Sequence, residues 1–204
     1  APSCTIQMSS FTSTLSYSIG TYIRAQFTAT NSKGTSTVSS PSTGTIVAQS
    51  APTIAVSGLS ATSTVSTITL SWTALTSNTD IGYSSITGYL ITNDNGTPSN
   101  NADDTTTTVT STSHTFSGLT TGTSYTFTVA AINVQGTGPA STSFSFVAAD
   151  VPGQMDKVVI SQTAGSTLVK FKWTQPSALN GLPVTSYKLL FYKPNAYPAG
   201  NEEV

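Results

Sequence analysis

Few residues of this chain could carry out acid–base, nucleophilic or metal chemistry. Its 204 residues include one His, one Cys and eight Asp or Glu. A zinc site built from His and Cys needs three or four such ligands, so the chain cannot form one. Serine is abundant, but no G-x-S-x-G turn presents a nucleophilic serine beside a base. We therefore predict no catalytic residue, no metal and no cofactor in this chain, which is not expected to be an enzyme.

Two groups of carboxylates are candidate cation sites. Asp103 and Asp104 could join Asp94 and Asn93, but the stretch lacks the D-x-N-x-N-G ladder and bidentate Glu of a calcium loop. A solvated loop is the favoured interpretation, with Ca²⁺ binding as the alternative. The second group, a pair, flanks the Val-Pro sequence at 151–152 and could bridge two domains through a cation; it consists of Asp150 and Asp156.

The isolated His114 has a structural interpretation. It lies two residues before Phe116 on an expected strand, where an aromatic ring would pack. A ligand or catalytic role is the less favoured alternative.

Covalent modification is the chemistry that the composition favours. Asn95-Gly96-Thr97 is an N-glycosylation sequon on an expected hairpin tip. Dense hydroxyl runs at 35–42 and 105–108 could carry O-linked sugars, although outward Thr is also what a solvent-facing strand prefers. The candidate O-linked positions in the second run are Thr105, Thr106, Thr107 and Thr108.

The single thiol, Cys4, is also a candidate for covalent chemistry. In a secreted protein an unpaired Cys implies a partner elsewhere, so we predict a disulfide to a Cys outside this chain. A buried free thiol is the alternative.

Composition excludes several partner classes. Only 7% of residues are charged, the net charge is −1, and Lys and Arg total seven, so we expect no nucleic-acid partner. The longest apolar runs are about four residues, far below the ~20 that cross a bilayer, so no membrane contact is expected within the chain. Abundant Thr, Val and Ile, with eight Tyr and eight Phe, favour an all-β fold over disorder.

The clearest element lies between residues 110 and 146. Tyr125, Phe127, Val129 and Ala131 alternate with small polar or Ala residues, as in a half-buried antiparallel strand. The turn chemistry at 133–136 and the alternating Phe144 and Phe146 then predict a hairpin. Earlier in the chain, the Asn-Gly pair at 95–96 suits the positive φ angles of a type I′ turn.

Internal repeats divide the chain. Asn31 and Gly34 recur as Asn133 and Gly136, both displaced by 102 (133 − 31 and 136 − 34). A second register pairs residues near the start of each copy, with spacings close to 100, the length of one sandwich domain. Its anchors are Pro52 with Pro152, Trp72 with Trp173, and Ile86-Thr87-Gly88-Tyr89 with Val184-Thr185-Ser186-Tyr187.

The repeat predicts three parts and their strands. Residues 1–50 are expected to be the C-terminal half of a sandwich, 51–150 a complete domain, and 151–204 the N-terminal half of a further domain. No helix is expected. The predicted strands cover 4–8, 22–31, 36–47, 53–56, 68–72, 86–92, 105–110, 112–116, a segment near Val158, 168–173 and 186–192, with a loop shaped by Gly181 at 176–183.

On these residues the chain resembles tandem fibronectin type III domains, which are immunoglobulin-like β-sandwiches. The anchors are Trp72, Tyr89, Leu119 and Tyr125 in the complete copy, and Trp173 with Tyr187 in the last. In this resemblance Tyr125 starts its strand at a tyrosine corner. The first copy departs from the pattern because Ile23 replaces the corner tyrosine. Its sequence is similar to repeats in large surface and secreted proteins of ciliates and related protists.

The resemblance implies an extracellular or cell-surface module for spacing, adhesion and assembly. Its partners would be neighbouring copies or domains of the same protein in an array, surface coat, stalk or filament, together with covalent glycans. Half domains could be completed along one long chain or between chains, head to tail. The alternatives are spacer domains of a secreted polysaccharide-active enzyme, or a receptor ectodomain, whose functional domain lies outside this chain.

Overall fold

The computed structural model of the chain describes residues 3–191 and 202–203. These residues form two compact units by their contacts. The first contains 3–62, 68–117 and 124–146, and the second contains 63–67, 118–123, 147–191 and 202–203. Below, residues 1–50 are the N-terminal segment, 51–150 the central segment and 151–204 the C-terminal segment.

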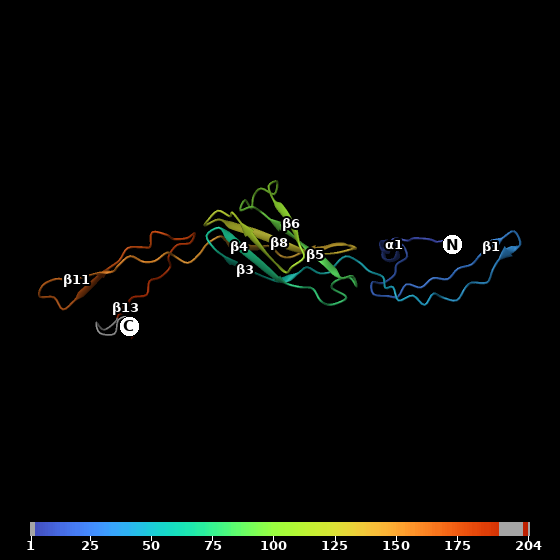
Figure 1. The fold of residues 1–204 in the computed structure, drawn as a ribbon, viewed down its shortest axis with the longest axis horizontal. Coiled ribbons are helices and arrows are strands. Elements are labelled where there is room, and N and C mark those ends of the chain that lie inside the picture. Colours follow the sequence, from blue (N-terminus) through green and yellow to red (C-terminus); the bar gives the residue numbers. More distant parts are fainter. Residues whose placement is uncertain (1–2, 192–201, 204) are drawn as a thin grey trace. The chain divides into compact units, whose positions relative to one another are not determined.

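Two antiparallel sheets form the central segment, in two layers (Figure 1). The three-stranded sheet has the order β3-β4-β7, from Ser57–Ser63, Thr67–Thr73 and Ser113–Ser117. The five-stranded sheet has the order β10-β8-β5-β6, with β9 also paired to β8. Its strands are β5 (Ile86–Asn93), β6 (Thr105–Val109), β8 (Ser124–Asn133), β9 (Gly136–Ala140) and β10 (Phe144–Val147). The all-β sandwich expected from the sequence is confirmed.

Alternate side chains of these strands fill the space between the layers. Ile68 and Leu70 of β4 and Phe127 and Val129 of β8 are fully buried, and Tyr125 is almost so. The predicted inward faces of both strands are therefore confirmed. Burying each large apolar side chain stabilises the fold by about 1.5–3 kcal/mol before entropy costs.

Local differences from the predicted strands have simple causes. β3 and β9 were not predicted, because both are rich in Ser, Thr and Gly and show no apolar alternation. Residues 53–56, predicted as a strand, are irregular. Asn95 and Gly96 do have positive φ angles of 51° and 78°. They lie, however, within a longer connection between β5 and β6 rather than in a two-residue hairpin loop.

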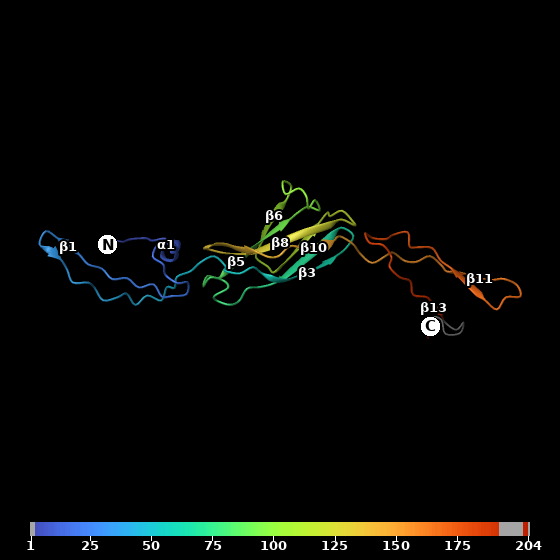
Figure 2. The same ribbon diagram turned by 180° about the vertical axis from the view of Figure 1, so that it is seen from behind.

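The N-terminal segment is less regular than predicted. The expected strand at 4–8 and the expected absence of helix are both wrong, since Met8–Ser13 forms the short helix α1. Regular pairing is limited to β1 (Thr30–Asn31) with β2 (Gly34–Thr35) and a bridge between Tyr22 and Val47. Figure 2 shows these residues as a long hairpin with β1 near its tip.

Along that hairpin, serine hydroxyls accept backbone N–H groups that a carbonyl of the facing strand would accept in a regular sheet. Ser36, Ser39 and Ser42 each donate a backbone N–H to a carbonyl of the facing strand, at 2.7–2.8 Å. Each also accepts the N–H of the same facing residue on its Oγ, at 3.0 Å. The facing residues advance by two (Ala25, Phe27, Ala29) while the serines advance by three, so the predicted strand at 36–47 is not a regular β-strand.

The C-terminal segment is built from two strand pairs. β11 (Val159–Gln162) pairs with β12 (Val169–Lys172), close to the predicted strands. β13 (Leu190–Phe191) pairs with β14 (Glu202–Glu203) and covers only part of the strand expected at 186–192; Tyr192 lies outside the described residues. Gly181 has a φ of +99°, as expected for the loop at 176–183.

The central core generates a stability prediction. We expect Phe127→Ala to lower the free energy of unfolding by about 3–5 kcal/mol, because it opens a cavity at a fully buried position. Urea unfolding followed by Trp72 fluorescence in a Trp173→Phe background measures this change. Val134→Ala is the matched control, since Val134 is 75% exposed and should change the unfolding free energy by under about 0.5 kcal/mol. Equal effects of the two variants would contradict the described core.

Candidate functional site

The carboxylates that could bind a cation accept hydrogen bonds from backbone and hydroxyl groups. Asp94 Oδ1 accepts the N–H groups of Gly96 at 2.9 Å and Thr126 at 2.8 Å, which fastens the connection after β5 to β8. Asp103 accepts the Thr97 hydroxyl on both carboxylate oxygens. Across residues 3–191 and 202–203, no three His, Cys, Asp or Glu side chains gather to hold a metal ion.

The second carboxylate pair also has local partners. Asp150 Oδ1 accepts the Val151 N–H at 2.7 Å, and Asp156 Oδ2 accepts the Thr174 hydroxyl at 3.2 Å. Asp150 therefore binds the next residue and Asp156 a residue 18 positions later, and no contact between the two carboxylates is described.

The remaining single residues occupy structural or surface positions. The His114 ring packs edge-on against Phe116, with centroids 4.7 Å apart, as its structural interpretation requires. Cys4 is exposed and free, so the buried-thiol alternative is wrong, while a disulfide to a Cys outside this chain stays a prediction. In the described part of the chain, no helix is long and apolar enough to cross a bilayer.

The sequon lies in a hydrogen-bonded loop. Asn95 Nδ2 donates to the Asp103 carbonyl, while its Oδ1 accepts from Asn93 and from Thr105. The Thr97 hydroxyl is held by Asp103. A glycan on Asn95 must therefore be attached before this loop closes, or break the contact with Asp103.

Of the O-linked candidates on β6, Thr105, Thr106 and Thr108 are exposed and Thr107 is partly buried. They face solvent or the edge of the sheet, so both interpretations given for this run remain.

Two anchors of the complete copy, Trp72 and Tyr89, form a buried ring pair. Trp72 and Tyr89 are 6% and 4% exposed, and their rings meet edge-on with centroids 5.3 Å apart. Burial raises the pKa of the Tyr89 hydroxyl above its ordinary value. Leu119 is partly buried before Tyr125. The contact between Trp72 of β4 and Tyr89 of β5 joins the two layers.

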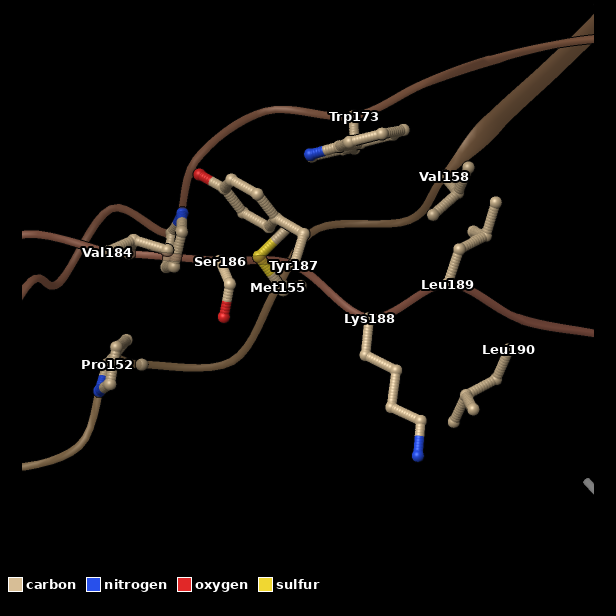
Figure 3. Close-up of a pocket in the computed structure, with 12 residues that line it drawn as sticks. Pro152, Met155, Val158, Trp173, Val184, Ser186, Tyr187, Lys188, Leu189 and Leu190 are labelled. Carbon is tan, nitrogen blue, oxygen red and sulfur yellow. The ribbon is translucent and has the colours of Figure 1, made fainter. Parts of the chain in front are cut away.

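The same pair recurs in the C-terminal segment without cover. The Trp173 and Tyr187 rings lie 5.7 Å apart, yet they are 40% and 46% exposed. They line a hollow of about 390 Å³ whose walls are mostly apolar and include Met155 and Val158. In Figure 3 the two rings lie beside Met155 while Lys188 extends away from them. This surface, called the open face below, is the main candidate site.

The N-terminal segment carries a second uncovered surface. Phe27 is 71% exposed, whereas Val129, its counterpart 102 residues later, is fully buried. Tyr22 and Ile46 on the same hairpin are also exposed. The described residues therefore carry exposed counterparts of two groups that are buried in the central segment, the Trp72 and Tyr89 pair and the inward side chains of β8.

Backbone contacts repeat where one segment meets the next. The N–H of Ser50 donates to Gly82 and that of Asp150 donates to Asn180, both at 2.9 Å. Three further pairs correspond in the same way. They are Gly20 to Ala48 with Gly122 to Ala148, Ala48 to Thr21 with Ala148 to Thr123, and Thr53 to Asp80 with Gly153 to Ala178. The sequence repeat is therefore a repeat of hydrogen bonding as well.

Asn133 completes the first of these junctions. Its buried Nδ2 donates to the carbonyls of Ser50 at 2.8 Å and Ile81 at 2.9 Å, while its Oδ1 accepts the N–H groups of Gln135 and Gly136. Sequence reasoning found Asn133 only as a turn residue. Its recurrence as Asn31 was the available signal for a larger role.

A repeated serine was also missed. Ser141 exchanges the same pair of contacts with Val129 that Ser39 makes with Phe27, 102 residues earlier. Because Ser is so common here, its position gave no signal apart from the displacement.

One protein family model and several solved structures match parts of the chain. Residues 50–147 match the family model of the fibronectin type III domain. No curated protein sequence matches the chain. Among solved structures, the FN1-FN3 domains of chicken CNTN1 are 27% identical with a TM-score of 0.42, over 61% of this chain and 41% of that one. The domains A168-A170 of titin are 25% identical with a TM-score of 0.40, over 48% of this chain and 32% of that one. The chain thus spans less than half the length of either structure.

Asn133 generates a second stability prediction. We expect Asn133→Ala to lower the unfolding free energy by about 2–3 kcal/mol, because buried carbonyls lose their donor. The matched control is Asn31→Ala, whose exposed side chain accepts only the Lys33 N–H at 2.8 Å among the described contacts. At low protein concentration the control should cost less than about 1 kcal/mol by urea unfolding. Similar losses of unfolding free energy from both variants would show that the hydrogen bonds of Asn133 to Ser50 and Ile81 do not stabilise the junction.

The sequon generates a third prediction. When the chain is secreted from eukaryotic cells, we expect an N-linked glycan on Asn95, added before the loop closes. Intact mass before and after enzymatic removal of N-glycans measures it, with Asn95→Gln and Thr97→Ala as variants that should lose the added mass. An unmodified polypeptide mass in the wild type would refute this.

Proposed function

We propose that this chain is a non-catalytic part of a tandem array of fibronectin type III domains in an extracellular coat, stalk or filament. The observation that carries the proposal is the repeated junction. Two successive segment boundaries use corresponding backbone bonds, Ser50 to Gly82 and Asp150 to Asn180. Such recurrence is expected of modules that follow one another in series.

The surface chemistry supports a spacing or adhesive role. The sequence contains only 7% charged residues and the strands expose many hydroxyl groups. The acidic side chains described above accept hydrogen bonds from backbone or hydroxyl groups of the chain itself. The finer resemblance, to surface proteins of protists, fits the same role.

The proposal also says what covers the two exposed apolar surfaces of the N-terminal and C-terminal segments. The open face and the exposed hairpin at 20–48 each need a cover, because a bare apolar sheet face promotes association. In the array, each would be completed by a neighbouring domain or copy of the same protein, with glycans adding to surface hydration.

Location on the cell surface is the test of this function. Antibodies against the chain should label intact, unpermeabilised cells of the source organism, and negative-stain images of the native material should show repeating globules along a strand. An antibody against a cytosolic protein is the control for leakage. Labelling only after permeabilisation would exclude an extracellular array, and recovery with a separate catalytic domain would favour the enzyme-spacer alternative.

A further inference from the structure

The open face has a covered counterpart in the same chain. In the central segment Trp72 of β4 and Tyr89 of β5 meet between the two sheets, and the inward side chains of β8, which pairs with β5 in the same sheet, are buried in the same core. The corresponding positions of the C-terminal segment are exposed. Among the described residues of the C-terminal segment, no strand takes the place that β8 has beside β5.

An equivalent of β8 is present at the other end of the chain. A displacement of 102 places Ile23, Ala25, Phe27 and Ala29 on the four inward residues of β8. The contacts of Ser36, Ser39 and Ser42 already fold the segment as a hairpin, and the one between Ser39 and Phe27 matches that between Ser141 and Val129. It needs only a sheet to lie against.

We propose that the open face of one chain binds the hairpin at 20–48 of a second copy, so that two half domains form one fibronectin-type sandwich. This deepens the proposed function, on which it rests, by naming the partner. The contact joins two different surfaces, so each added chain presents a new open face and the assembly propagates head to tail.

The central segment supplies the register. Tyr89 lies opposite Ala131, Leu90 opposite Ala130 and Ile91 opposite Val129. Displacements of +98 for β5 and −102 for β8 carry these pairs onto the two copies. The expected partners are Tyr187 with Ala29, Lys188 with Thr28, and Leu189 with Phe27 of the second copy.

The edge needed for this pairing follows from the neighbouring strands. β5 pairs with β6, the next strand along the chain, on one edge and with β8 on the other. β13 pairs with β14, which likewise follows it along the chain. By this correspondence the second edge of β13 is the one that receives the hairpin.

Asn31 adds a polar contact to the apolar one. Its counterpart Asn133 donates to the carbonyls of Ser50 and Ile81. Displacements of +100 for Ser50, +98 for Ile81 and −102 for Asn133 put Asn31 against the carbonyls of Asp150 and Leu179 in the second copy. The hairpin would thus both cover the apolar face and close the junction at 150–151.

Complementary variants test the interface with the full chain. Phe27→Asp damages the hairpin and leaves the open face, while Trp173→Asp does the reverse. Each variant alone should remain monomeric at about 1–100 μM, because association must be weakened more than about tenfold by losing a central aromatic. A mixture of the two should form dimers that cannot grow, near twice the 21.0 kDa of one chain. Wild type and the control Val134→Asp should form longer assemblies in sedimentation velocity.

Disulfide trapping tests the register even if one of those variants misfolds. In a Cys4→Ser background, Thr28→Cys with Lys188→Cys should give a ladder of linked multimers on oxidation. Thr28→Cys with Leu189→Cys is the control, because a shift of one residue turns the side chain to the other face. A ladder confined to the first pair supports the inference.

Two results would overturn it. Equal trapping by both pairs refutes the register, and a wild-type chain that stays monomeric throughout refutes completion by a second copy. In the latter case a further domain of a longer chain covers the open face. Surface labelling of intact cells is independent of both results, so the array function can stand or fall separately.

Discussion

An apolar sheet face must be covered by a second apolar face, and the rest of this structure depends on that constraint. Where the cover is present, in the central segment, Trp72 and Tyr89 are buried and strands are long and regular. Where it is absent, Trp173 and Tyr187 keep their mutual contact but remain open to solvent. The contact between the two rings therefore forms between segments that follow one another in the sequence. Burial of the rings, in contrast, needs residues that are distant in the sequence.

The same distinction explains how the regularity of the strands varies. β5 is paired on both edges and runs over Ile86–Asn93, whereas the corresponding strand of the C-terminal segment is regular only over Leu190–Phe191. Strand propensity is largely the energy of packing on a pleated, half-buried surface. Without that surface, sequences of similar pattern form short ladders and extended stretches.

Much of the fold could be predicted from residue patterns alone. The alternation at 124–131 and at Ile68, Leu70 and Trp72 identified the inward faces correctly, because burial on one side imposes a period of two. β3 was missed because its side chains are small and polar, so its place in the sheet is decided by the neighbouring β4. Helix α1 was missed for a related reason: without a partner strand, local turn bonding such as that of Thr14 to Ser10 prevails.

The candidate site was less predictable than the fold. The sequence showed that Trp173 repeats Trp72, but not that its surroundings form a hollow with Met155 and Val158. Likewise, the Asn-to-Gly turn was visible at both positions, but the carbonyls that Asn133 caps lie 83 and 52 residues away. Contacts of that range are fixed by tertiary packing, which no local pattern encodes.

The serine contacts of the N-terminal hairpin have a consequence for unwanted growth. A strand can be extended sideways only if its outward N–H and C=O groups repeat with the spacing of a neighbour. Along 36–42 the chain advances three residues for every two of the facing strand, and hydroxyls take up the inner N–H groups. Its outer edge is therefore out of step with any regular strand. Such a chain is protected on one side against amyloid-like stacking while its opposite side remains free to pair.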